Sequence, residues 1–162
     1  MSVANDIAAT YRGPGRVVSR LLAMGPREDR AIAILMAACA LMFIAQLPRL
    51  SREAHLVGGD LNMMIGGALM GWIFFAPLFF YLLAWVSHMI LRAVGGQAGS
   101  WSSRIALFWA LLASAPLFLL LGLVQGFIGD GLQATVIGAL WAAAFLWFWI
   151  AGLAQVRSIA AV

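Results

Sequence analysis

Apolar residues fill four long stretches of the chain, and the polar residues gather between them. The stretches are residues 31–47, 62–91, 105–128 and 132–155. None of them contains Asp, Glu, Lys or Arg. A helix needs about 20 apolar residues to cross the hydrocarbon core of a bilayer. The pattern therefore predicts an all-α fold, a polytopic transmembrane helix bundle with four spans in residues 31–155. Polar tails at 1–30 and 156–162 flank this domain.

The first stretch is the shortest, and its helix is expected to begin before it. Proline is favoured at the first helical position, so Pro26 indicates a helix start. The acidic Glu28 and Asp29 suit the positive N-terminal end of the helix dipole. Pro48 closes the apolar stretch, and we expect the first span to end there.

Polar and glycine residues mark the other boundaries. Asp60 is expected to cap the second helix and Ser100 the third, because their side chains accept hydrogen bonds from free backbone N–H groups. Only residues 129–131, Gly-Asp-Gly, join the third stretch to the fourth. These two helices are therefore predicted to be antiparallel neighbours.

The N-terminal tail contains a pattern typical of an amphipathic helix over residues 15–24. At 100° per residue its apolar side chains share one broad face: Val17, Val18, Leu21, Leu22 and Met24. Arg12, Arg16 and Arg20 recur every four residues on the other flank. Such a helix lies in the plane of the membrane interface and is attracted to anionic lipid headgroups. The alternative is a flexible tail whose arginines only set the orientation.

Composition supports a membrane protein and excludes a soluble one. Of the 162 residues 64% are hydrophobic and 10% are charged, whereas soluble domains carry about 25% charged residues. A single Cys excludes a disulfide framework and multi-Cys metal sites. The net charge of +4 is small, so we expect no nucleic-acid partner.

All the basic residues are arginines, and their sidedness predicts the orientation. One side of four spans would hold Arg12, Arg16, Arg20, Arg27, Arg30, Arg92, Arg104 and Arg157. The other side would hold only Arg49 and Arg52. Both termini are therefore predicted to be cytoplasmic, in a multi-pass membrane protein.

Ionisable residues inside a membrane mark ion or proton pathways, and the four stretches have none apart from His88 near a helix end. A dyad of His88 with Ser114 is unfavourable because the two residues lie at different depths. His88 and Arg92 are four apart and share a helix face. This face is a candidate site for a phosphate headgroup; the alternative is an interfacial histidine beside a topology-setting arginine. We expect no enzymatic activity, no metal site and no cofactor.

Small residues recur at four-residue spacing, which lets helix backbones approach closely in lipid. The candidate packing positions are Gly67 and Gly71, Gly122 and Gly126, and Gly138. The alternative is that glycine is simply abundant in this chain.

Two prolines stand near the middle of predicted spans in matching contexts. Ala76-Pro77-Leu78-Phe79 resembles Ala115-Pro116-Leu117-Phe118. Broken helices at the midplane in opposed repeats are typical of transporters. Helix kinks at Pro77 and Pro116 without transport are the alternative.

The chain resembles the Yip family of small membrane proteins, in its bacterial branch. Four segments carry the resemblance: Tyr11-Arg12-Gly13-Pro14, Leu47-Pro48-Arg49, the Ala-Pro-Leu-Phe segments, and residues 87–100. The likeness covers roughly residues 8–155. The family is described with five spans, whereas we count four here. Eukaryotic members of the family are linked to vesicle trafficking and small GTPases, and no catalytic residues carry over to this chain. The resemblance to the bacterial branch implies a multi-pass protein of the bacterial cytoplasmic (inner) membrane.

We therefore expect a non-enzymatic membrane interaction, scaffolding or lipid-organising protein. Its expected partners are anionic lipids at the cytoplasmic face, and a second copy or a larger membrane complex. The alternative is a small permease or lipid-handling transporter built on Pro77 and Pro116. A transporter predicts a polar cavity near the prolines, reached by Ser114 or Gln125, and a scaffold predicts a closed bundle with an external small-residue face.

Overall fold

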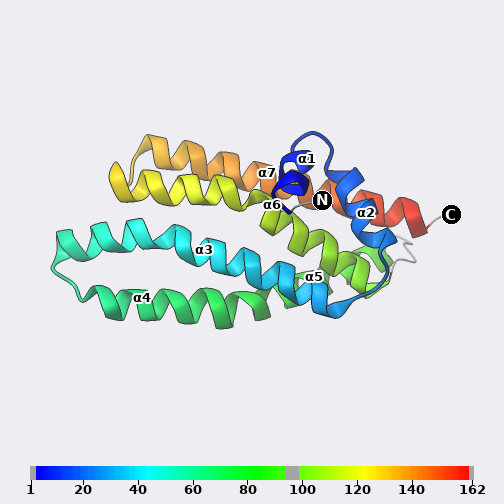
Figure 1. The fold of residues 1–162 in the computed structure, drawn as a ribbon, viewed down its shortest axis with the longest axis horizontal. Coiled ribbons are helices and arrows are strands. Elements are labelled where there is room, and N and C mark those ends of the chain that lie inside the picture. Colours follow the sequence, from blue (N-terminus) through cyan, green and yellow to red (C-terminus); the bar gives the residue numbers. More distant parts are fainter. Residues whose placement is uncertain (1–2, 94–98, 161–162) are drawn as a thin grey trace.

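The structure, a computed structural model, describes residues 3–93 and 99–160, and the described residues are almost entirely helical (Figure 1). The elements are α1 (Val3–Thr10), α2 (Pro14–Ala23), α3 (Glu28–Val57), α4 (Leu61–Leu69), η1 (Met70–Phe75), α5 (Ala76–Ala93), α6 (Ser100–Phe127) and α7 (Leu132–Ala160). Four continuous helical segments are long and apolar enough to cross a membrane: α3, α4 to α5, α6 and α7. The predicted all-α fold with four candidate spans is confirmed.

The helix α3 differs from its prediction at both ends. It begins at Glu28 with Arg27 as its N-cap, whereas Pro26 was expected to be its first helical residue. It also continues through Pro48 to Val57. Leu50 and Ala54 stay buried beyond the proline, so packing on one face offsets the single backbone hydrogen bond that proline removes. The helix ends where Gly58 adopts a left-handed conformation, with φ of 69°.

The second span is one uninterrupted helix from α4 to α5. Asp60 caps it as predicted, accepting a hydrogen bond from the Asn62 N–H at 2.9 Å. The π-helical segment η1 ends at Phe75, two residues before Pro77, and so contains the residue four positions before the proline. A proline ring clashes with the carbonyl four residues earlier in an α-helix, and a wider π turn relieves that clash. Pro77 therefore deforms the span instead of dividing it.

Two details of α6 also differ from expectation. Its N-cap is Gly99, and Ser100 is the first helical residue. Pro116 lies inside a helix that runs without interruption from Ser100 to Phe127. The short turn to α7, with Gly129 at φ of 104°, makes α6 and α7 antiparallel neighbours as predicted.

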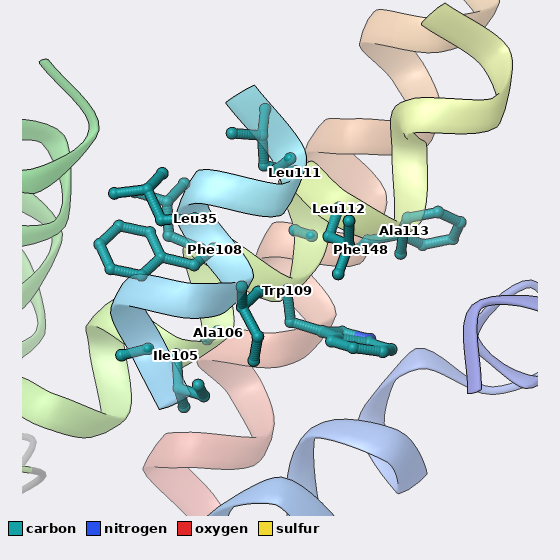
Figure 2. Packing of buried hydrophobic residues seen from close by; sticks show 14 of the residues in the cluster. Leu35, Ile105, Ala106, Phe108, Trp109, Leu111, Leu112, Ala113 and Phe148 are labelled. Atoms are coloured by element: carbon teal, nitrogen blue, oxygen red, sulfur yellow. The ribbon is translucent and has the colours of Figure 1, made fainter. Parts of the chain in front are cut away.

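The central element of the bundle is α6, which contacts α3, α5, α7 and both N-terminal helices. In its most apolar window 56% of the residues are buried. Figure 1 shows it between α3 and α7. Figure 2 shows the core that results, with side chains of α6 meeting α3 and α7: Leu35, Ile105, Ala106, Phe108, Trp109, Leu111, Leu112, Ala113 and Phe148.

The helices α6 and α3 come close enough for their backbones to touch at two glycines. A Cβ on Gly122 would collide with the backbone oxygen of Ala45, and a Cβ on Gly126 would collide with Pro48. Both glycines thus sit where backbone meets backbone. Because lipid offers no hydrophobic driving force between helices, such close packing is a main source of association energy.

Replacing Gly122 with Ala is expected to destabilise the bundle by about 1–3 kcal/mol, the usual cost of overpacking. Gly66→Ala is the matched control, because nothing lies within 4 Å of a Cβ at that position. The control is expected to leave stability unchanged or to raise it slightly, since Ala favours helix. Unfolding by SDS in mixed micelles measures both. Equal stability of Gly122→Ala and wild type would contradict the close α3–α6 contact.

Candidate functional site

The helices α1 and α2, together the N-terminal pair, are docked on α6 and α7. Thr10 is fully buried, and its hydroxyl accepts a hydrogen bond from Trp109 Nε1 at 3.0 Å. The Tyr11 hydroxyl donates to the carbonyl of Ala113 at 3.1 Å, and its ring meets Phe148 edge-on with centroids 5.0 Å apart. Burial raises the pKa of the Tyr11 phenol. Figure 2 shows the Trp109 indole directed toward the N-terminal pair.

The contact of Tyr11 with Ala113 places α1 beside the membrane-spanning part of α6. At 1.5 Å per residue, Ala113 lies about 12 Å along the helix from Ile105, where the apolar stretch begins. The N-terminal pair therefore lies alongside the membrane-spanning part of α6 and extends past its start. The helix α1 was not predicted; its signal was the spacing of Ile7 and Thr10, which face the core together.

The predicted amphipathic helix exists as α2, but protein covers its apolar face. Val17 and Val18 are 2% and 1% exposed, and they belong to the common core with α6 and α7. The interfacial helix was expected to turn this face to lipid. Sequence cannot separate the two cases, because the acyl chains of lipid are as apolar as a protein core.

The candidate headgroup arginines remain on the exposed side of this pair. Arg12 and Arg16 are exposed. Arg20 forms an ion pair with Asp6 at 2.8 Å, which joins α2 to α1. Arg12 and Arg16 therefore present their charge outward, and Arg20 stabilises the N-terminal pair through its ion pair with Asp6.

A cavity of about 280 Å³ lies between α5 and α6, near the N-terminal end of α6, and we call it the α5–α6 cavity. Its lining residues are Tyr81, Ala84, Trp85, His88, Ser100 and Arg104. His88 Nδ1 is buried without a hydrogen-bond partner. Aromatic walls beside a polar end suit an amphipathic ligand. Arg92, which was predicted to act with His88, is exposed on α5 and does not line this cavity.

Arg104 takes the place that the prediction gave to Arg92. Its guanidinium makes a two-pronged contact with Glu28, at 2.8 Å to one oxygen and 3.0 Å to the other. It also donates to the side-chain and backbone oxygens of Ser100 at 3.3 and 3.4 Å. The charge of Arg104 is thus largely compensated within the chain. The signal in the sequence was a pair of opposite charges on the same predicted side of the membrane: Glu28 at the start of the first span and Arg104 at the start of the third.

Neither Pro77 nor Pro116 lines the α5–α6 cavity. Neither of them lines either of two further cavities, which lie at the end of the bundle that carries the α6–α7 turn. Ser114 is buried, and its hydroxyl donates to the carbonyl of Leu111 at 2.9 Å. Gln125 lies near the far end of α6 and bonds to Asp130 at 3.4 Å. The two polar side chains that a transport cavity was expected to use are therefore engaged elsewhere.

The candidate packing glycines separate into two groups. Gly122 and Gly126 lie against α3, as described above. Among the described residues, no other helix comes within 4 Å of a Cβ built on Gly67 or Gly71, and a Cβ on Gly138 meets only the Leu121 side chain, at 3.8 Å. Within one chain, only the first group lets helices approach closely.

Comparison with protein-family models, with curated proteins and with solved structures found no match. Membership of the Yip family therefore stays a prediction. Among the residues that the structure describes, no group of three or more His, Cys, Asp or Glu side chains is placed to hold a metal ion.

Thr10→Val is expected to loosen the N-terminal pair, because it leaves the buried indole N–H of Trp109 without an acceptor at a cost of about 1–3 kcal/mol. Amide exchange in residues 3–23 should become about tenfold faster. Thr135→Val is the control: its hydroxyl bonds to Gly131 on an exposed turn, and exchange in residues 3–23 should not change. Unchanged exchange in Thr10→Val would contradict the docking role of this bond.

Proposed function

We propose that the chain is a non-enzymatic integral membrane protein of the bacterial inner membrane. It resembles the Yip family, and it acts as a membrane interaction or scaffolding component or as an organiser of lipid. Both termini face the cytoplasm in this proposal, which the sidedness of the arginines supports.

One observation carries the proposal: two of the four candidate spans bury only a small share of their residues within the chain. In the most apolar window of the second span 6% of the residues are buried, and in that of α7 11%. The exposed large side chains on α7 include Val136, Leu140, Leu146, Trp147 and Ile150. Their spacing is four, six, one and three residues, and at 100° per residue all five fall within a sector of about 120°, so they share one apolar face along the helix.

The arrangement of the helices explains why these faces are open. The helix α7 packs on α6 and on α2, so it is attached along one edge of the bundle. The second span is attached along α3 and α6. A bundle built around one central helix thus exposes more apolar surface to the membrane than a closed four-helix arrangement would. Such surface is what lipids or a partner span would occupy.

Transport remains the alternative. Its specific expectation, a polar cavity at the two prolines, has no support from Ser114 or Gln125, whose hydrogen bonds lie elsewhere. The interaction function is therefore the one that the geometry supports best.

Photo-crosslinking residues placed on α7 test the proposal. Trp147, 53% exposed, is the test position, and its neighbour Phe148, 1% exposed, is the matched control. In cells, the Trp147 position should give discrete adducts with a second copy or another membrane protein, or with lipid that survives gentle detergent. The Phe148 position should react within the chain. A lipid-free monomer without adducts at Trp147 would contradict the proposal.

A further inference from the structure

Two cavities meet at the end of the bundle that carries the α3–α4 loop and the α6–α7 turn, and both are lined by Arg49 and Glu53. One, of about 290 Å³, lies between the end of α3 and the α6–α7 turn. The other, of about 410 Å³, lies between α3 and α4, and we call it the α3–α4 cleft. Its lining residues are Gln46, Arg49, Leu50, Glu53, Met64, Gly67, Ala68 and Trp72.

The cleft exists because α4 presents small residues to α3. Gly67 and Ala68 have too little side chain to fill the space, and a Cβ on Gly67 would meet nothing within 4 Å. The cleft reaches Trp72 of η1, whose ring contacts Phe118 of α6 edge-on with centroids 5.6 Å apart. From Met64 to Trp72 the helix rises about 12 Å. The cleft is widely open to the surface of the bundle, and its lining changes from a charged mouth at Arg49 and Glu53 to apolar residues toward Trp72.

The charge at the mouth of the cleft is incompletely compensated. Arg49 approaches Glu53 only at 4.0 Å, and both side chains are about half exposed. Exposed pairs of this kind contribute about 0–1 kcal/mol. The Nε of Arg49 is buried and has no hydrogen-bond partner. Arg104, by contrast, is held on two sides by Glu28. Of these two cavity-lining arginines, Arg49 is therefore the one whose guanidinium has N–H groups without an acceptor.

We propose that the α3–α4 cleft binds one anionic phospholipid, with its phosphate at Arg49 and one acyl chain along Gly67 and Ala68 toward Trp72. A guanidinium suits a phosphate because its N–H groups form a fixed fork. Gln46, one turn deeper on α3, supplies a further amide donor. The volume falls within the range of small-molecule sites, about 300–1,000 Å³. The apolar depth of the cleft distinguishes this ligand from a free anion, which would use only its mouth.

This site deepens the lipid-organising part of the proposed function and rests on it. The experiments on the proposed function and on the lipid site can fail separately, because the first probes α7 and the second probes the cleft between α3 and α4. The probe is phosphatidylglycerol, titrated against the purified full chain in non-ionic detergent, with bound lipid counted by native mass spectrometry. Phosphatidylcholine with the same acyl chains tests the contribution of net charge.

The wild type is expected to bind one phosphatidylglycerol about tenfold more tightly than phosphatidylcholine. Arg49→Gln should remove this preference, and Arg49→Lys should keep part of it because the charge remains. Arg157→Gln is the control for general attraction, since Arg157 is exposed at the opposite end of α7 from the α6–α7 turn. It should bind as the wild type does.

The acyl-chain half of the site has a control in the adjacent residue. Gly67→Leu fills the cleft and should weaken phosphatidylglycerol binding about tenfold. Gly66→Leu should bind normally, because Gly66 also has open space around it but does not line the cleft. Wild-type affinity in Arg49→Gln or in Gly67→Leu would overturn the site. So would equal binding of the two lipids by the wild type. Displacement of the lipid by an equal concentration of inorganic phosphate would assign the site to a free anion and overturn the lipid.

Discussion

The packing of α6 against α3 at Gly122 is the contact on which the other parts of the structure depend. In a bilayer every backbone group is satisfied within its own helix, and helices associate through the closeness of their surfaces. Gly122 and Gly126 bring α6 to the backbone of α3 at Ala45 and Pro48. With α3 fixed on one side, α6 offers its remaining faces to α5, α7 and the N-terminal pair. The result is a bundle around one central helix.

This central arrangement explains both where the chain is closed and where it is open. The N-terminal pair covers α6 and α7 along the end near the start of α6, held by Thr10 and Tyr11. At the opposite end none of the described residues covers the space between α3 and α4 in this way, and Gly67 leaves the α3–α4 cleft there. The open faces of α7 and the second span follow from the same geometry. Interaction and lipid binding are therefore assigned to surfaces that the packing leaves free.

The sequence predicted the four candidate spans and the Asp60 cap because charge exclusion and capping are local properties. It did not predict that α3 would continue past Pro48, since that depends on burial of residues beyond the proline. It assigned the apolar face of α2 to lipid, because lipid and protein select the same side chains. Arg104 was missed as a cavity residue for a related reason: its partner Glu28 is distant in the chain and becomes a neighbour only in the fold.

We propose that the chain crosses the membrane four times and returns both termini to the cytoplasm. Cysteine labelling in intact cells tests it most directly, because the native Cys39 is buried. Cysteines replace Gly59, in the α3–α4 loop, or Ser158, near the end of α7. The account predicts that a membrane-impermeant thiol reagent labels Gly59→Cys in intact cells and labels Ser158→Cys only after the membrane is opened. Labelling of both positions in intact cells, or of Ser158→Cys alone, would contradict it.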